Sequence, residues 1–289
     1  MPVLTVNLIG AGRVGRTLLA LLARAQGCRV QQVFSSRESA ARAAVDFAGA
    51  GRVARSLAEM SPADLWLLTV PDTAIAGVAG DLAAINPRRG AALAAPVALH
   101  CSGFHPAEAM APLRGLGWHL ASAHPVLSFA DPETALRQFP GTFCGLEGDA
   151  AALAVVEPLL RSIGARIFPI RSEAKSFYHA GAVISNNFTV VLQAIARGAW
   201  DRAGVPQDVA RALNAHLLRA TVETLSAQEP AAALTGPAAR GDMEVVERQG
   251  RDVADWNALA GRVYRDLSRL AVRLKAEGRI AGDDDGAGA

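Results

Sequence analysis

The sequence predicts an α/β fold, with helices packed on a parallel sheet in the N-terminal part and an all-helical C-terminal part. Three observations lead to this prediction. The apolar run 3–9 passes through three spaced glycines into an amphipathic helical pattern. Short apolar runs and helical patterns then alternate up to about residue 170. Beyond that point the ordered patterns are helical.

The glycines at the first strand–helix junction have the spacing of a dinucleotide-binding turn. Gly10 allows a tight turn, Gly12 leaves room for a pyrophosphate, and Gly15 lets the helix pack closely on the strand. Phosphate charge would then meet free N–H groups at the helix N-terminus. The alternative is a plain glycine-rich turn. The predicted cofactor contacts here are Gly10, Ala11, Gly12, Arg13, Val14 and Gly15.

The end of the second predicted strand, 29–34, bears on the choice of cofactor. An acidic residue at this place accepts hydrogen bonds from the ribose hydroxyls of NAD, whereas arginine accommodates the 2′-phosphate of NADP. This chain has Ser35, Ser36 and Arg37 here, which favours NADP(H). In the alternative interpretation, Ser36 only caps the helix predicted over 38–47.

The remaining elements of the N-terminal domain follow in alternation. The near-continuous apolar run 64–70 is typical of a strand covered on both faces, and Val70 and Pro71 at its end complete the predicted cofactor site. The other predicted strands are 51–54, 96–100, 118–123, 142–146 and 165–170, and the other predicted helices are 73–85 and 149–163. We expect a dinucleotide-binding domain over 1–170.

The second predicted domain, 171–280, consists of helices over 172–203, 208–227 and 253–277, with loops at 204–206 and 229–242. The uncharged segment 176–196 is long enough to span a bilayer, but His179 and its amide side chains are costly in lipid. We therefore expect a helix buried inside protein. The acidic, glycine-rich tail 281–289 is predicted to be disordered.

Lysine is informative in this chain because only two of the 29 basic residues are lysines. Lys175 opens the uncharged helix, and at α-helical spacing it shares a stripe with His179 and Asn186. A buried lysine can deliver a proton, which an arginine effectively cannot. We predict Lys175, His179 and Asn186 as catalytic residues. Alternatively, Lys175 extends to solvent and the amides satisfy neighbouring backbone.

Candidate substrate contacts come from two places. His100, Ser102 and His124 end two strands at the edge where cofactor and substrate would meet, although each could be only a strand-end hydrogen bonder. The loop 229–242 contains Thr235, Arg240 and Asp242. The guanidinium of Arg240 suits a carboxylate of the substrate. A helix-capping role for this loop is the alternative.

Bulk composition limits the partners. The net charge of +2 gives no broad basic surface, so neither nucleic acid nor a membrane is an expected partner. Cys28, Cys101 and Cys144 lack the spacing of a disulfide framework or zinc site, and no metal is expected. No leader pattern precedes the first strand, which predicts a cytoplasmic protein acting on a small molecule.

The whole pattern resembles NADP-dependent oxidoreductases that join a Rossmann domain to an all-helical domain, relatives of ketopantoate reductase, pyrroline-5-carboxylate reductase and 6-phosphogluconate dehydrogenase. More narrowly, it resembles Rossmann-like proteins with an uncharacterised helical C-terminal domain. The motifs that carry the resemblance are LIGAGRVG at 8–15, LHCSG at 99–103, AHP at 123–125, KSFYH at 175–179, SNN at 185–187 and LTGPAARGD at 234–242.

This resemblance implies an NADPH-dependent reductase of a small polar carbonyl compound, with a ketopantoate-like 2-oxo acid as the favoured substrate. Lys175 and Asn186 look like the catalytic lysine and asparagine of those enzymes, whereas His179 replaces an expected asparagine. The resemblance also implies a homodimer formed through the helical domain. The alternatives are an imine reductase of the pyrroline-5-carboxylate type and a non-catalytic NADP(H)-binding or sensing protein.

Overall fold

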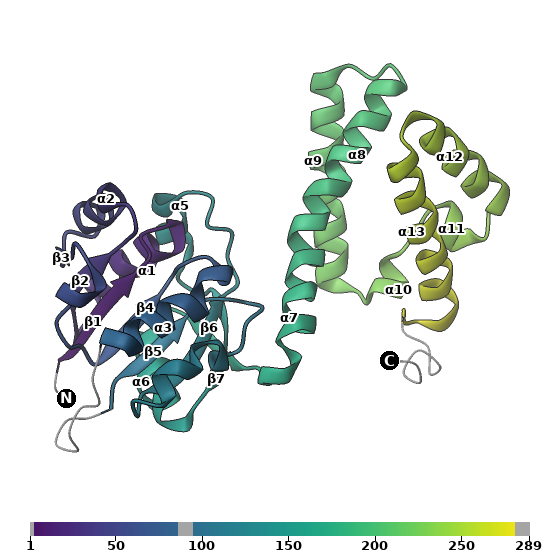
Figure 1. Ribbon diagram of the computed structural model, residues 1–289. Coiled ribbons are helices and arrows are strands. Elements are labelled where there is room, and N and C mark those ends of the chain that lie inside the picture. The colour runs from purple at the N-terminus through teal and green to yellow at the C-terminus, as the bar shows by residue number, and fades with distance from the viewer. Residues whose placement is uncertain (1–2, 86–94, 281–289) are drawn as a thin grey trace. The chain divides into compact units, whose positions relative to one another are not determined.

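The computed structural model describes residues 3–85 and 95–280 (Figure 1), so the tail predicted to be disordered lies outside the described residues. The chain divides into two compact units, Met1–Val183 and Ile184–Ala289. All strands of the described residues belong to the first unit, and the last of them ends at Pro169. The domain boundary near residue 170 stays a prediction.

The first unit contains one sheet, with eight strands among the described residues. The strands from β1 to β6 run parallel, β7 runs antiparallel to β6, and β8 is parallel to β7. Their order across the sheet is β3 (Arg52–Val53), β2 (Cys28–Phe34), β1 (Leu4–Ile9), β4 (Leu65–Leu68), β5 (Val97–His100), β6 (His119–Pro125), β7 (Phe143–Gly148) and β8 (Arg166–Pro169). The predicted α/β class with a parallel-dominated sheet is confirmed.

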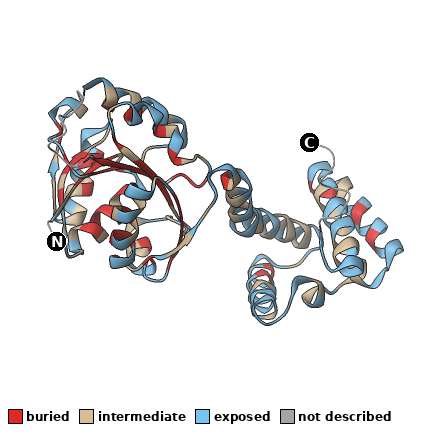
Figure 2. Ribbon diagram, turned by 90° about the horizontal axis from the view of Figure 1, so that it is seen from below, coloured by how far each residue is buried: buried red, intermediate tan, exposed pale blue. Residues whose placement is uncertain are grey.

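Helices pack on both faces of this sheet, as the strand sequences require. In β4, Leu65 and Leu67 enter one buried cluster while Trp66 and Leu68 enter the other. The continuous apolar run is therefore buried on both sides, and Figure 2 shows the sheet as the main buried region of this unit. The helices of this unit before β8 are α1 (Arg13–Arg24), α2 (Glu38–Ala48), α3 (Ile75–Ile85), α4 (Ala111–Arg114), α5 (Pro132–Gln138) and α6 (Ala150–Ser162).

Two of these helices, α4 and α5, are absent from the sequence prediction because they are short. Asp131 fixes the start of α5, since its carboxylate accepts hydrogen bonds from the backbone N–H groups of Glu133 and Thr134. This helix contacts α1 and helps to cover one face of the sheet.

The C-terminal helices are more broken than the sequence predicts. The predicted helix 172–203 consists of the 3-10 turn η4 (Ser172–Ala174), α7 (Lys175–Ala182), the π-helical turn η5 (Val183–Phe188) and α8 (Thr189–Arg202). The predicted helix 253–277 is interrupted at Asn257, whose side chain accepts from Ala260 N and caps a new helix. The remaining helices are α9 (Gln207–Ala227), α10 (Pro230–Ala233), α11 (Pro237–Arg240), α12 (Met243–Trp256) and α13 (Ala258–Glu277).

Small residues hold the second unit together. A Cβ on Gly261 of α13 would lie 2.5 Å from Cα of Ala254 in α12, so only glycine permits this approach. A Cβ on Gly198 of α8 would lie 2.6 Å from the ring of Trp256, so a side chain at this position would also overlap its neighbour. Asn214 of α9 donates a hydrogen bond to the backbone oxygen of Gln193 in α8.

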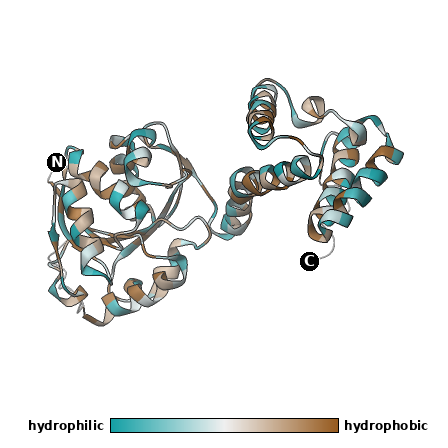
Figure 3. Cartoon of the chain, turned by 90° about the horizontal axis from the view of Figure 1, so that it is seen from above, coloured by the Kyte–Doolittle hydropathy of each residue, from teal (hydrophilic) through white to brown (hydrophobic). Residues whose placement is uncertain are grey.

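Several side chains of the uncharged segment 176–196 are exposed, and the burial of this helix inside protein stays a prediction. Phe177 is 88% exposed and Val190 is 66% exposed. Other apolar side chains of the second unit, such as Leu217 and Leu259, are also exposed. Figure 3 shows apolar residues in brown along the helices of this unit. Among the described residues, no helix combines the length and the apolar character needed to cross a bilayer.

Candidate functional site

A pocket of about 650 Å³ opens at the carboxyl ends of β1, β2 and β4. It lies where the strand order reverses between β1 and β4, which is the usual place for a dinucleotide in such sheets. The structure brings all of the predicted cofactor residues except Gly15 into its lining. The lining residues include Gly10, Ala11, Gly12, Arg13, Val14, Ser35, Ser36, Arg37, Val70 and Pro71.

The three glycines have the geometry expected from their spacing. Gly10 has φ of +100°, and a Cβ there would lie 2.7 Å from the backbone of Thr69. A Cβ on Gly15 would overlap the carbonyl oxygen of Gly10, so Gly15 allows the close packing of α1 and does not line the pocket. A Cβ on Gly12 would meet nothing within 4 Å. Gly12 therefore keeps space open beside the helix N-terminus.

The end of β2 exposes the residues that favour NADP. Arg37 is the N-cap residue of α2, and no side chain makes a capping hydrogen bond there, so the alternative role of Ser36 as a cap is not seen. Ser36 and Arg37 are both exposed at the pocket. The guanidinium of Arg37 is thus available to an anion.

A second polar group lies farther along the same edge, on three neighbouring strands. His100 of β5 pairs with Ser122 of β6, and Ser122 pairs with Glu147 of β7. Lys175 of α7 lies on this row and is only 1% exposed. Its ammonium donates to the carbonyl oxygen of Ser102 at 2.8 Å and to the hydroxyl of Ser122, and it lies 3.6 Å from Oε1 of Glu147.

Lys175 and Glu147 form a buried ion pair. Burial lowers the pKa of Lys175, and the attraction of Glu147 opposes that shift. The carboxylate of Glu147 also accepts from Ala107 N at 2.7 Å and from the Ser172 hydroxyl at 2.6 Å. Both partners of the pair are therefore held by further hydrogen bonds, as buried charges require.

His100 and Ser102 use their polar atoms within the protein. Nδ1 of His100 accepts from Ser102 N, and Nε2 donates to the carbonyl oxygen of Pro106. Burial lowers the pKa of His100 to about 4. The Ser102 hydroxyl donates to Asp72 at 2.9 Å and accepts from the N–H groups of two following residues. A substrate contact for His100 and Ser102 stays a prediction.

A third group lies two residues farther along β6, on the same face. Nδ1 of His124 lies 2.8 Å from the Tyr178 hydroxyl. Gly145 is opposite His124 in the β6–β7 register, and a Cβ there would overlap the Ile170 side chain and lie 3.0 Å from the Tyr178 hydroxyl. Burial lowers the pKa of His124 to about 4 and raises the pKa of Tyr178 to about 12, so both side chains are neutral near pH 7.

His179 completes this group from α7. Its ring lies nearly perpendicular to that of His124, with centroids 5.5 Å apart. Its Nδ1 is buried and has no hydrogen-bond partner among the described residues. A Cβ on Gly103 would overlap Nδ1 of His179 and would lie 2.9 Å from Nε2 of His124. The two rings therefore pack closely against Gly103 and leave no room for a side chain there.

The other predicted residues lie in the second unit, Ile184–Ala289. Asn186 is in the π-helical turn η5, which departs from the regular α-helical spacing on which the Lys175 stripe was predicted. Arg240 and Asp242 form an exposed ion pair at 3.0 Å. Thr235 lies between α10 and α11. A catalytic role for Asn186 and substrate contacts for Thr235, Arg240 and Asp242 stay predictions.

The sequence prediction missed Glu147, Tyr178 and Gly103. Glu147 carries a weak signal, since it is a charge that directly follows an apolar strand pattern. Tyr178 adjoins His179, but only the packing of α7 against β6 shows that its hydroxyl reaches His124. Among the described residues, no group of three or more metal-ligating side chains could hold a metal ion.

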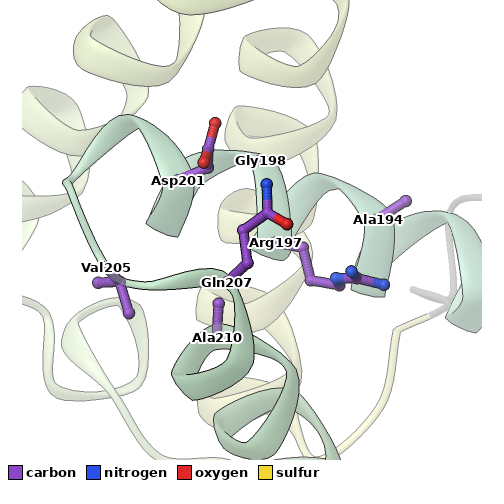
Figure 4. A pocket seen from close by; sticks show the side chains of 7 residues that line it. All are labelled: Ala194, Arg197, Gly198, Asp201, Val205, Gln207 and Ala210. Carbon is purple, nitrogen blue, oxygen red and sulfur yellow. The ribbon is translucent and has the colours of Figure 1, made fainter.

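Another pocket, of about 310 Å³, lies between α8 and α9 in the second unit (Figure 4). None of the predicted site residues lines it. Its charged side chains, Arg197 and Asp201, are exposed. It offers no enclosed polar arrangement comparable to that around Lys175.

Comparison with known proteins agrees with this architecture. Residues 1–125 match the Rossmann-like domain, and residues 142–271 match the domain of unknown function DUF2520. No curated protein matches the sequence. The second match begins with β7, so it includes the strand that carries Glu147.

Solved structures of similar fold cover nearly the whole chain. Protein TM1727 from Thermotoga maritima has 27% identity and a TM-score of 0.72, over 95% of this chain and 100% of that chain. The "putative NADP oxidoreductase BF3122" from Bacteroides fragilis has 25% identity and a TM-score of 0.74, over 93% and 98%. A pyrroline-5-carboxylate reductase from Coxiella burnetii, at 13% identity, 92% and 98% coverage and a TM-score of 0.58, shares the fold. The chain therefore combines a Rossmann-like domain with a DUF2520 domain, as its sequence motifs imply.

Proposed function

We propose that this protein is an NADPH-dependent oxidoreductase that reduces a small polar carbonyl compound, with a ketopantoate-like 2-oxo acid as the favoured substrate. One observation carries the proposal: the dinucleotide pocket and the buried polar groups lie along the same edge of one sheet. The similarity to the Bacteroides fragilis protein, whose name includes NADP oxidoreductase, supports it.

The order of the strands places the proposed cofactor pocket beside the buried polar residues. The pocket occupies the ends of β2, β1 and β4, and the polar residues occupy the ends of β5 and β6. Two strand spacings, about 10 Å, separate β4 from β6. The hydrogen bond from Ser102 to Asp72 links the two regions, since Asp72 directly follows the pocket residue Pro71. This arrangement suits a nicotinamide directed from β4 towards β5.

The pocket residues fit a dinucleotide phosphate. The open space beside Gly12 and the N-terminus of α1 suit the pyrophosphate, and Arg37 with Ser36 suits a 2′-phosphate. When bound, NADPH would supply hydride to the carbonyl carbon. The protein must orient the carbonyl compound and provide a proton to its oxygen.

Lys175 was predicted to donate this proton. In the structure its ammonium has three oxygen partners, from Ser102, Ser122 and Glu147. Lys175 would have to give up one of these contacts before it could donate to a substrate. These contacts favour Lys175 as a positioning residue, which joins the ends of β5 and β6 to α7.

We also propose a homodimer formed through the helical unit. Val209, Leu213 and Leu217 of α9 are exposed by 43%, 38% and 53%, and their spacing of four residues puts them on one helix face. A second copy of the chain would cover this apolar face. Sedimentation tests this point: Leu213→Glu with Leu217→Glu should produce a monomer, and an unchanged mass would contradict it.

Cofactor binding is the first test of the proposed function. We expect NADPH to bind more tightly than NADH, as measured by fluorescence titration of the purified protein. Arg37→Ala should weaken NADPH binding and leave NADH binding unchanged. Equal binding of the two cofactors by the unsubstituted protein would contradict the assignment of NADP.

Turnover is the second test. A screen of 2-oxo acids and cyclic imines, which follows the oxidation of NADPH, should find a 2-oxo acid that is reduced. Preferential reduction of cyclic imines would indicate an imine reductase. Tight binding of NADPH without oxidation by any compound would indicate a sensing protein.

A further inference from the structure

We propose that Phe129 binds the nicotinamide half of the cofactor, and that Arg13 holds Phe129 in place while it binds the adjacent pyrophosphate. This inference rests on the proposed function and deepens it, because it assigns residues to the part of the pocket that would receive the nicotinamide half. Phe129 is then a cofactor-binding residue, and Arg13 is both a cofactor contact and a positioning residue.

Phe129 reaches the dinucleotide pocket from a distant part of the chain. It lines the pocket, whereas the other lining residues of the described chain lie between Ile9 and Val78. Phe129 belongs to the segment 126–131, which joins the end of β6 to the start of α5. Its side chain is half-buried, so it offers apolar surface that a bound ligand would cover.

Both ends of the segment 126–131 are fixed. The N–H of Val126 donates to the carbonyl oxygen of Phe143 at 2.8 Å, which extends the pairing of β6 with β7. At the other end, Asp131 caps α5, and α5 contacts α1. The segment therefore runs from the end of β6 towards α1, the helix that begins at the glycine turn.

Arg13 joins the middle of this segment to the glycine turn. Its Nη1 donates to the carbonyl oxygens of Phe129 at 3.5 Å and of Ala130 at 3.4 Å. Both distances exceed the usual N–H···O length of about 2.9–3.0 Å, so these hydrogen bonds are weak. Among the described residues, no carboxylate pairs with Arg13, and its Nε and Nη2 have no hydrogen bond. The exposed guanidinium therefore keeps donors for an anion.

The place of Arg13 suits the pyrophosphate. Arg13 is the first residue of α1 and directly follows Gly12, where space is open at the N-terminus of the helix. A phosphate there would accept charge-assisted hydrogen bonds from the guanidinium. Because Nη1 holds the segment and the other nitrogens remain for the phosphate, one planar group can do both. A bound pyrophosphate would thus fix Arg13 and, through it, Phe129.

The strand order places Phe129 on the nicotinamide side of the pocket. Ser36 and Arg37 follow β2, on one side of β1, and they suit the 2′-phosphate of the adenosine half. β6 lies on the other side of β1, beyond β4 and β5, and Phe129 follows β6. β6 also carries His124, one of the buried polar residues of the site. The apolar ring of Phe129 is therefore expected to contact the half of the cofactor that lies away from Arg37.

Titrations with whole and truncated cofactors test this assignment. Phe129→Ala should weaken the binding of NADPH and of NADH by about tenfold each, or about 1.4 kcal/mol, because both contain the same nicotinamide half. Binding of 2′,5′-ADP, which lacks that half, should stay unchanged and would show that the variant is folded. Phe177→Ala is the matched control, since this ring is 88% exposed and does not line the pocket. It should bind all three compounds as the unsubstituted protein does.

A double variant tests the positioning role of Arg13. Arg13→Met should weaken both dinucleotides, because it removes the charge next to the pyrophosphate. In Phe129→Ala with Arg13→Met, the loss of NADPH affinity should be smaller than the product of the two single losses, since Arg13 acts partly through Phe129. Single losses that multiply would exclude this positioning role.

The emission of bound NADPH gives a second measurement, because the reduced nicotinamide ring is the fluorescent group. At saturating NADPH, Phe129→Ala should move the emission towards that of free NADPH. Arg37→Ala, at the adenosine half, should leave the emission of the bound ring unchanged. The inference is overturned if Phe129→Ala changes neither the emission nor the affinity for NADPH, or if it weakens 2′,5′-ADP as much as NADPH.

The outcomes separate this inference from the proposed function. If the unsubstituted protein reduces a 2-oxo acid and Phe129→Ala binds NADPH normally, the assignment of Phe129 is wrong and the function stands. If Phe129→Ala gives the expected binding pattern but the unsubstituted protein reduces no compound, the assignment stands and the proposed reductase fails. If the unsubstituted protein binds neither NADPH nor NADH, both fail.

Discussion

Replacing Lys175 by methionine should strongly destabilise the N-terminal unit. Methionine keeps most of the side-chain volume but removes the ammonium, which leaves the carboxylate of Glu147 buried without its cation. Glu147 retains hydrogen bonds from Ala107 and Ser172, but these do not neutralise it. Removing one partner of a buried pair costs about 3–5 kcal/mol.

The cost is measurable as a change in thermal unfolding. For a unit of this size, about 2–4 °C of Tm corresponds to 1 kcal/mol, so Lys175→Met should lower Tm by about 6–20 °C. Trp66 and Trp118 report on this unit, because their rings lie 5.5 Å apart in its core. The matched control is Lys275→Met, since this exposed lysine makes one hydrogen bond, to the backbone of Ala231.

A double variant separates loss of the ion pair from loss of packing. In Lys175→Met with Glu147→Gln, no uncompensated charge remains, so this protein should be more stable than Lys175→Met alone. If Lys175→Met unfolds within about 0.5 kcal/mol of the unsubstituted protein, as surface substitutions do, the buried ion pair is refuted.

Three further predictions follow from the same geometry. Gly15→Ala should lower Tm because its methyl group overlaps the carbonyl oxygen of Gly10. Gly12→Ala should keep Tm and weaken NADPH binding. Equal changes in Tm for the two variants, measured by calorimetry, would contradict the separate roles of Gly15 in packing and Gly12 in cofactor binding. Burial lowers the pKa of His100 to about 4, whereas in the unfolded chain it is about 6.5. As the pH falls below about 6.5, the unfolded chain therefore takes up a proton that the folded chain does not. The free energy of unfolding should fall by up to about 3 kcal/mol by pH 4. Urea unfolding at a series of pH values should show that the free energy of unfolding depends less on pH in His100→Gln than in the unsubstituted protein. Ser36→Asp should shift binding from NADPH towards NADH, and fluorescence titration with an unchanged ratio would exclude Ser36 from the ribose contact.

The nucleotide pocket could be predicted from the sequence because its information is local. Gly10, Gly12 and Gly15 act within six residues of chain, and their spacing specifies a turn, an opening and a close contact. The same holds for β4, where an unbroken apolar run indicated burial on both faces. Short-range patterns of this kind depend little on the rest of the fold.

The groups around Lys175 and His124 could not be predicted in full, because they depend on strand register. Glu147 reaches Lys175 because β7 is antiparallel to β6 and places Glu147 opposite Ser122. The same register places Gly145 opposite His124, where the missing side chain leaves space for Ile170 and for the Tyr178 hydroxyl. Neither the direction of β7 nor its register is visible in the composition of the strand.

Helix breaks were the other source of error. The pattern of apolar residues from 172 to 203 continues through η5, but the hydrogen bonds change there to the π-helical type, which shifts the helical phase before Asn186. At Asn257, a single side chain caps α13 and separates it from α12. Hydrophobic periodicity describes which face is apolar and does not show where the backbone hydrogen bonds change.

Transfer of deuterium from labelled NADPH tests the central claim most directly. The unsubstituted protein is incubated with 2-oxo acids and NADPH that carries deuterium at the transferred position, and the products are analysed by mass spectrometry. We predict a 2-hydroxy acid with one deuterium on the former carbonyl carbon. Bound NADPH with no labelled product from any 2-oxo acid or cyclic imine would contradict the claim that this protein is a reductase.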